Sequence, residues 1–279
     1  MKMNFIRRTA GLALASLTAL ALAAPVSAQS TRQQLSGESV IETIKEDGVI
    51  TVGISLFRPW SMRDLNGELV GFELDVARQL AEDMGVEIEF VPTAWDGIIP
   101  ALLSGKFDAI ISGMSITPQR NLTVSFSDPY AYSGQTILAN IAMTEGFTME
   151  DFNSPDVIFA ARRGATSVNV IEAAFPKAKL LQFDEDSAVT QEVLNGNAHA
   201  LVSSEPVPSE AARNYPDTVY VPFDESLLAA GEAIAFRKGD PDAENFFNNW
   251  IGVKTRNGWL KERHDYWFRT DEWHGEVPE

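Results

Sequence analysis

Short runs of β-branched and apolar residues alternate with amphipathic helical stretches along most of this 279-residue chain. Residues 49–54 (VITVGI) have the composition of a buried strand, and residues 86–91 alternate apolar and acidic side chains as a half-exposed strand does. Between them, residues 71–84 carry apolar side chains at the spacing of one helical face. Strands that alternate with helices of this length form βαβ units around a parallel sheet. The sequence therefore predicts an α/β protein.

The same alternation continues through the rest of the chain. A helix is expected at residues 95–104, closed by a glycine, and a buried strand at residues 107–112. Two α/β units in series, with a late strand that can return to the first unit, predict two lobes joined by two crossings. The further strands are expected at residues 157–161, 180–183, 198–203 and 231–236, and the further helices at residues 167–174, 187–195, 241–257 and 258–268.

Composition excludes several classes of function. The chain has no cysteine, which excludes disulfides, thiolate metal sites and cysteine nucleophiles. Its three histidines, His199, His264 and His274, form no spaced metal motif, and no cofactor-binding loop is recognisable. The formal net charge of −17 argues against nucleic acid or anionic lipid as a partner and favours solubility.

The first 28 residues have the pattern of a secretory signal peptide. Lys2, Arg7 and Arg8 precede an apolar stretch of about 15 residues, too short to span a bilayer, and the small residues Val26-Ser27-Ala28 suit a cleavage site. A membrane anchor is the alternative reading. Cleavage near Ala28 would remove three positive charges and take the net charge from −17 to −20.

Five motifs in register identify a resemblance that covers essentially the whole mature chain. The segments resemble those of family 3 solute-binding proteins, the receptors of amino-acid ABC importers. The motifs are NGELVGFELDVA (66–77), WDGIIPAL followed by GKFDA (95–109), SGMSITPQR followed by FSDPY (112–130), GATS (164–167) and FRKGDP (236–241).

The resemblance implies the two-lobed periplasmic-binding-protein fold of type II, with ligand in the cleft between lobes joined by two hinge strands. The first lobe is expected at residues 29–134 plus 230–279 and the second at residues 135–229. The hinges are expected near residues 133–138 and 224–231. It further implies a soluble, monomeric periplasmic receptor that binds a small carboxylate-bearing solute, an amino acid or a relative, without cofactor or metal. Its partner would be an ABC permease in the inner membrane.

The same resemblance points to a site for the carboxylate of the ligand. Family members hold this group with an arginine at the position of Arg120, whose planar guanidinium can donate two parallel hydrogen bonds. Ser112, Gly113 and Ser115 would add hydroxyl and backbone N–H donors. Thr166 begins a predicted helix, and a helix N-terminus favours an anion. Each assignment has a structural alternative. Arg120 could be a surface arginine, the small residues from Ser112 to Ser115 a tight turn, and Thr166 an ordinary helix cap.

Aromatic residues are expected to cover the remainder of the ligand. Phe57, Trp60 and Trp95 match family positions that carry aromatic or large apolar pocket side chains. A role in the hydrophobic core is the alternative, most of all for Trp60.

Two departures from the family pattern leave the ligand open. Ser204 stands where amino-acid receptors carry the aspartate that holds the α-ammonium group, and Glu205 is adjacent. Arg162 and Arg163 precede the GATS motif, and strand alternation points Arg162 into the cleft. A buried guanidinium needs a partner, which Glu205, a second ligand carboxylate or a structural ion pair would supply.

Three functions therefore remain open after the sequence is read. The first is a receptor for an amino acid, and the second is a receptor for an amine-free carboxylate. The third is an enzyme on the same fold, resembling periplasmic cyclohexadienyl dehydratases, for which Glu205 is the candidate acid. Nothing resembles a nucleophile–base pair, so the sequence favours a binding protein over an enzyme. A sensor module is less favoured still, since no signalling segment is recognisable.

Overall fold

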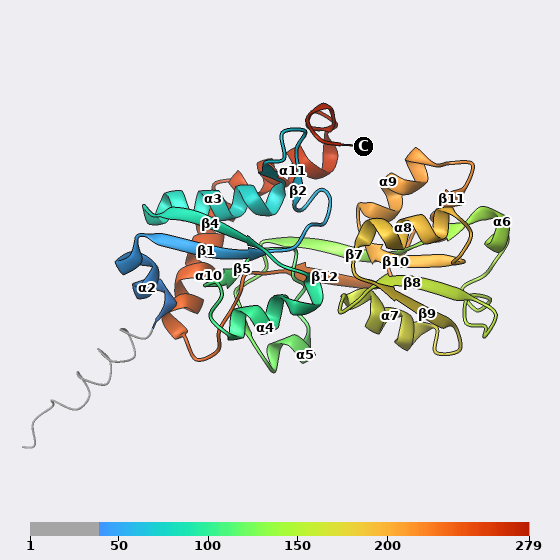
Figure 1. Ribbon diagram of the computed structural model, residues 1–279, viewed down its shortest axis with the longest axis horizontal. Helices are drawn as coiled ribbons and strands as arrows, with labels where there is room; N and C mark the ends of the chain where they lie inside the picture. Colours follow the sequence, from blue (N-terminus) through green and yellow to red (C-terminus); the bar gives the residue numbers. More distant parts are fainter. Residues whose placement is uncertain (1–38, 279) are drawn as a thin grey trace, which may run out of the picture.

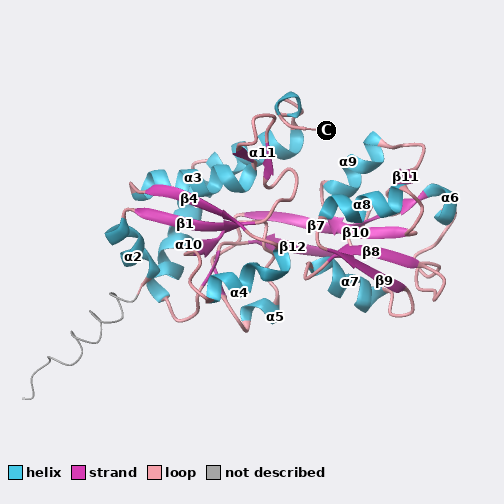
Figure 2. Cartoon of the chain, viewed as in Figure 1, coloured by secondary structure: helices cyan, strands magenta, loops and turns pink. Residues whose placement is uncertain are grey.

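Two α/β lobes lie side by side in the computed structural model (Figures 1 and 2), which describes residues 39–278. Each lobe is built on its own sheet, so the predicted two-lobed α/β fold is confirmed. The predicted signal peptide and its cleavage site lie outside the described residues. Among residues 39–278, no helix combines the length and the apolar character needed to cross a membrane.

The first lobe contains a five-stranded sheet in the order β4-β1-β5-β13-β6. Strand β1 (Val49–Ile54) pairs in parallel with β4 (Glu87–Pro92) and with β5 (Ala109–Ile110). Strand β13 (Ala235–Phe236) is antiparallel to β5 and to β6 (Ser125–Phe126). The late strand therefore returns to the first lobe, as the sequence predicts.

The second lobe has the sheet order β11-β7-β10-β8-β9. Strand β8 (Ile158–Arg162) is parallel to β9 (Lys179–Phe183) and to β10 (Ala200–Ser204). Strand β7 (Ala131–Asn140) is antiparallel to β10 and to β11 (Val219–Tyr220). Strands β8 and β10 end on the side that faces the first lobe, which places their last residues between the lobes (Figure 1).

Strands β7 and β12 (Leu228–Glu232) pair antiparallel and run between the lobes (Figure 1). The single strand predicted at residues 231–236 is wrong: the chain leaves β12 after Glu232 and enters β13 in another sheet. The break follows from competing partners, because Ala233 N donates to Met114 O instead of continuing the ladder with β7. The predicted lobe boundaries fall inside β7 and β12 and stay a prediction.

Helix α3 (Phe72–Met84) illustrates how the helices are positioned. Phe72, Val76 and Leu80 are fully buried, so one face packs against the sheet, and the helix ends at Gly85 in the left-handed conformation. The other helices, turns and short strands are α2 (Val40–Asp47), β2 (Met62–Arg63), β3 (Leu69–Val70), η1 (Trp95–Gly97), α4 (Ile98–Leu103), α5 (Pro118–Asn121), α6 (Ile141–Thr144), α7 (Thr166–Ala174), α8 (Asp186–Leu194), α9 (Val207–Asn214), α10 (Pro241–Arg256), α11 (Trp259–Arg269) and η2 (His274–Glu276).

Two predicted elements are shorter than expected, and both border the cleft. The helix predicted at residues 95–104 begins as the 3₁₀ turn η1, which turns Trp95 toward the second lobe. The strand predicted at residues 107–112 is paired only at Ala109 and Ile110. The chain beyond it turns at Gly113, whose φ of 59° is left-handed, and forms one wall of the cleft.

Candidate functional site

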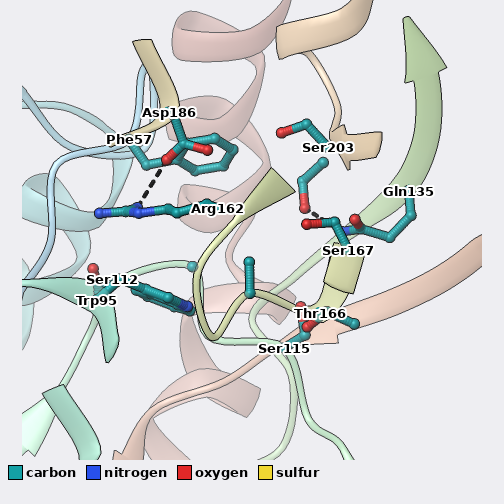
Figure 3. A pocket seen from close by; sticks show the side chains of 13 residues that line it. Phe57, Trp95, Ser112, Ser115, Gln135, Arg162, Thr166, Ser167, Asp186 and Ser203 are labelled. Carbon is teal, nitrogen blue, oxygen red and sulfur yellow. Dashed lines mark hydrogen bonds and ion pairs between the residues drawn. The ribbon is translucent and has the colours of Figure 1, made fainter. Parts of the chain in front are cut away.

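A polar cavity lies between the two lobes, where β8, β10 and the chain after β5 meet (Figure 3). It encloses about 430 Å³ of empty space, part of which is open to solvent. Both lobes contribute to its wall, so whatever fills it contacts both. Its lining residues are Phe57, Trp95, Ser112, Gly113 and Ser115 from the first lobe, and Gln135, Arg162, Ala165, Thr166, Ser167, Asp186, Ser203 and Ser204 from the second.

Arg162, the last residue of β8, is buried and reaches across the cleft. Its Nη2 donates to Ser55 Oγ at 2.7 Å and its Nη1 to Leu56 O at 3.3 Å, both in the first lobe. Its Nε donates to Asp184 O at 3.2 Å within its own lobe. The prediction that strand alternation points Arg162 into the cleft agrees with this placement.

Asp186 is the partner of Arg162, and the sequence reading did not single it out. Its Oδ2 lies 2.8 Å from Arg162 Nη1, but this oxygen makes no well-aligned hydrogen bond, so the contact is an ion pair (Figure 3). Burial raises the pKa of Asp186 to about 6, although the Arg162 guanidinium opposes the shift. The residue enters the cavity because β8 and β9 pair Arg162 with Phe183, three residues before α8 begins.

Trp95 lies close to two guanidinium groups. Arg120 and Arg162 stand 5.4 and 5.5 Å from the centre of its ring, within the range of cation–π attraction. Its indole Nε1 donates to Gly164 O of the second lobe at 3.1 Å. The ring therefore forms a wall of the cavity and joins the lobes.

Arg120 lies beside the cavity but is not one of its lining residues. Its Nη1 donates to Ser115 O at 2.9 Å and its Nη2 to Gly164 O at 3.2 Å, so it too joins the lobes. Burial lowers the pKa of Arg120 to about 10, which leaves the group charged at neutral pH. Among residues 39–278 no carboxylate forms an ion pair with it.

Hydroxyl groups cover much of the rest of the cavity. Ser112 Oγ accepts a hydrogen bond from Ser55 N at 2.8 Å, which fixes the Ser112 side chain within the first lobe. Ser204 Oγ accepts from Gln135 Nε2 at 2.5 Å, and Thr166 begins helix α7 at the opposite wall. Neutral donors and acceptors of this kind suit a small polar ligand.

Eight of the eleven predicted site residues line the cavity and three do not. Trp60 is buried in the first lobe, with its ring 4.6 Å from that of Phe268, and lies behind Gly113. Glu205 lies outside the lining, and its Oε2 accepts from Ser209 N at 3.4 Å near the start of α9. Arg120 is the third. The eight lining residues are Phe57, Trp95, Ser112, Gly113, Ser115, Arg162, Thr166 and Ser204.

Five lining residues were not predicted. Asp186 belongs to the acidic run Asp184-Glu185-Asp186 ahead of a predicted helix, a weak signal because such residues are common at helix starts. The other four are Gln135, Ala165, Ser167 and Ser203. In the part of the chain that the structure describes, no group of three or more histidine, aspartate and glutamate side chains is placed to hold a metal ion.

Comparison with known sequences gives one family. The profile of the bacterial extracellular solute-binding proteins, family 3, matches residues 50–270. Cyclohexadienyl dehydratase of Pseudomonas aeruginosa is 27% identical over 254 residues, which cover 90% of this chain and 92% of that protein.

Two solved structures extend the comparison. The ancestral amino acid-binding protein AncCDT-1, a precursor of cyclohexadienyl dehydratase, is 40% identical with a TM-score of 0.75, over 83% of this chain and 100% of that one. The binding component of an ABC transporter from Wolinella succinogenes, complexed with lysine, is 33% identical with a TM-score of 0.76, over 82% and 99% of the two chains.

Proposed function

This chain belongs to family 3 of the bacterial extracellular solute-binding proteins, and we propose that it is a periplasmic receptor that closes around one α-amino acid and delivers it to an ABC importer. The observation that carries the proposal is the cavity itself. Most of its lining side chains are polar, and its wall is divided between two lobes joined by β7 and β12. A ligand that touches both walls stabilises the closed arrangement more than an open one.

The carboxylate of the ligand is assigned to the Arg120 side of the cavity. Arg120 is charged, largely buried and without a carboxylate partner in the described residues, and it lies beside Ser115. Thr166 adds the N-terminus of the nine-residue helix α7, whose free N–H groups suit an anion. A carboxylate bound here would balance the charge of the guanidinium, for which residues 39–278 supply no carboxylate partner.

A thermal-shift screen tests the proposal. The mature protein is refolded to remove retained ligand and then heated with α-amino acids, dicarboxylates, keto acids and betaines. A ligand at about 1,000 times its Kd stabilises by roughly 4 kcal/mol, which for a chain of this size is a rise in Tm of about 8–16 °C. A clear rise with at least one α-amino acid is expected. A rise only with amine-free carboxylates would make this a receptor of another ligand class.

A dehydratase is the second candidate, favoured by the match to the Pseudomonas enzyme. Such a reaction needs a protonated carboxyl group that gives its proton to a departing hydroxyl. Glu205, the acid predicted from the sequence, lies outside the cavity lining, whereas Asp186 lies within it. With a pKa of about 6, Asp186 would be protonated in roughly one molecule in ten at pH 7. The ion pair with Arg162 already contributes to that pKa and holds it below the value that burial alone would give.

An assay for loss of prephenate or arogenate separates the two candidates. The receptor proposal expects no turnover above the uncatalysed rate. Turnover that disappears in the Asp186→Asn protein, while the Glu205→Gln protein keeps it, would establish the enzyme and identify its acid. Turnover that disappears in the Glu205→Gln protein would restore the acid predicted from the sequence.

A further inference from the structure

The cavity lacks a charged group at the position where an ammonium group was expected to bind. Ser204 offers a neutral hydroxyl, which already accepts from Gln135 Nε2. Glu205 cannot replace it without moving, because its side chain lies outside the lining and near the start of α9. The ammonium group of an α-amino acid needs a negatively charged partner once it is buried away from water.

Asp186 is the one carboxylate among the residues that line the cavity. Its side chain is mostly buried at the start of α8 and lies beside Arg162 (Figure 3). One of its oxygens, Oδ2, meets Arg162 without forming a well-aligned hydrogen bond. The carboxylate therefore keeps acceptor capacity that the protein does not use.

Arg162 does not depend on Asp186 for its position. Three further oxygens, Ser55 Oγ, Leu56 O and Asp184 O, accept from its three nitrogens. A rotation of the Asp186 side chain toward the cavity would leave every guanidinium nitrogen with an acceptor. Movement of the Asp186 carboxylate would therefore remove the ion pair but leave the three hydrogen bonds of Arg162 in place.

We propose that Asp186 accepts the ammonium group of the bound solute in place of residue 204, which makes it a specificity-determining residue of the receptor. The inference rests on the proposed function and names its ligand class, an α-amino acid whose side chain carries no positive charge. The exclusion of a positively charged ligand side chain follows from the charges of the site. Asp186 then balances the ammonium group and the ligand carboxylate balances Arg120, while Arg162 remains positive and opposes a further cation.

Matched probes that differ only in the α-amine test the assignment. The pairs are L-leucine with 4-methylpentanoate, L-glutamine with glutaramate, L-glutamate with glutarate, and L-lysine with 6-aminohexanoate. Their Kd values are measured by calorimetry at pH 7.5 with the wild-type, Asp186→Asn and Asp184→Asn proteins. Asp184 is the control because its exposed carboxylate pairs with Arg163 on the surface, at 3.0 Å, and with no other cation among residues 39–278.

The expected result is selective. For the α-amino acids that bind wild type, Asp186→Asn weakens binding about 10- to 100-fold, as expected for a hydrogen bond to a charged group. Binding of the amine-free partner changes less than about threefold, and Asp184→Asn leaves both unchanged. L-Lysine binds more weakly than the uncharged and acidic amino acids. If Asp186 had only a structural role, the Asp186→Asn substitution would weaken the binding of both probes of a pair equally.

Several results would overturn the inference. If amino acids bind and Asp186→Asn leaves their Kd unchanged, another group holds the ammonium, although the receptor function stands. Equal losses for L-lysine and 6-aminohexanoate would place Asp186 at a side-chain cation. Binding of amine-free carboxylates alone would refute both the inference and the amino-acid receptor. A parallel Asp186→Ser protein guards against misfolding of one variant, and the Tm of each ligand-free protein verifies its fold.

Discussion

Arg162 of the second lobe donates a hydrogen bond of 2.7 Å to the hydroxyl of Ser55 in the first lobe. Ser55 Oγ has this guanidinium as its partner, while the backbone N–H of Ser55 is bound by Ser112 Oγ. The contact therefore joins the two lobes directly through protein atoms. Together with the contacts of Trp95 and Arg120 to Gly164 O, it favours a closed arrangement of the lobes.

Ser55→Ala is expected to open the ligand-free protein. The substitution removes the hydroxyl acceptor but keeps the ion pair of Arg162 with Asp186. A hydrogen bond to a charged group contributes about 1.5–3 kcal/mol, so the ratio of closed to open molecules should fall about 10- to 150-fold. Small-angle X-ray scattering should record a larger radius of gyration. Ser104→Ala is the control, because that hydroxyl donates only to Ala101 O of its own helix; equal radii for both variants would contradict the prediction.

Arg120→Ala is expected to keep its fold and lose the carboxylate ligand. Removal of the guanidinium leaves the ligand carboxylate without its cation, so we expect at least a 100-fold weaker Kd by calorimetry. Arg120→Lys should recover only part of the loss, because an ammonium cannot donate two parallel hydrogen bonds. Arg163→Ala, which removes an exposed arginine paired with Asp184, is the control. An unchanged Kd in Arg120→Ala would refute this site for the carboxylate.

Gly164→Ala tests the turn whose backbone oxygen accepts hydrogen bonds from Trp95 and Arg120 of the first lobe. Gly164 has a φ of 71°, a left-handed conformation that disfavours any β-carbon by about 1–2 kcal/mol. The added carbon would stand 3.5 Å from Asp96 Cα, an ordinary contact that does not block closure. We therefore expect urea denaturation to show a loss of about 1–2 kcal/mol with a nearly unchanged Kd. A large loss of affinity at unchanged stability would mean that the space at Gly164, rather than its conformation, matters.

The sequence predicted the backbone of the site better than its charges. Strand β1, helix α3 and the C-terminal helices follow from local periodicity, because the apolar face that each one buries is visible within a single segment. The motif from Ser112 to Ser115 likewise led to the cavity wall. These are properties of short stretches of chain, and local patterns record them.

Asp186 escaped prediction because its role arises from strand pairing. Arg162 and Asp186 are brought together only when β8 and β9 align Arg162 with Phe183, a register that neither segment specifies alone. The family pattern predicts that Trp60 is a pocket residue, yet its side chain is buried beneath Gly113. The direction of a side chain at a loop position depends on neighbours far along the chain.

A pair of buried carboxyl groups beneath the cavity gives a prediction for pH. Glu73 Oε2 accepts from Tyr130 Oη at 2.6 Å, and Glu232 Oε1 accepts from Ser133 Oγ at 2.6 Å, beside the two strands that join the lobes. Burial raises the pKa of Glu73 to about 8 and that of Glu232 to about 7, and each carboxyl keeps one oxygen without a hydrogen-bond partner. The folded protein therefore holds protons near neutral pH that the unfolded chain releases above about pH 4.5.

The sign of the effect follows from that difference in bound protons. Where the folded state binds more protons, its stability falls as pH rises, here from about pH 5 to about pH 8 for Glu73. Glu73→Gln removes this group, so the Tm of the variant relative to wild type should rise across that interval. The slope is up to about 1.4 kcal/mol for each pH unit, or roughly 3–6 °C in Tm. Glu68→Gln, at an exposed position, is the control, and parallel Tm curves for wild type and Glu73→Gln would show that Glu73 is ionised in the folded protein.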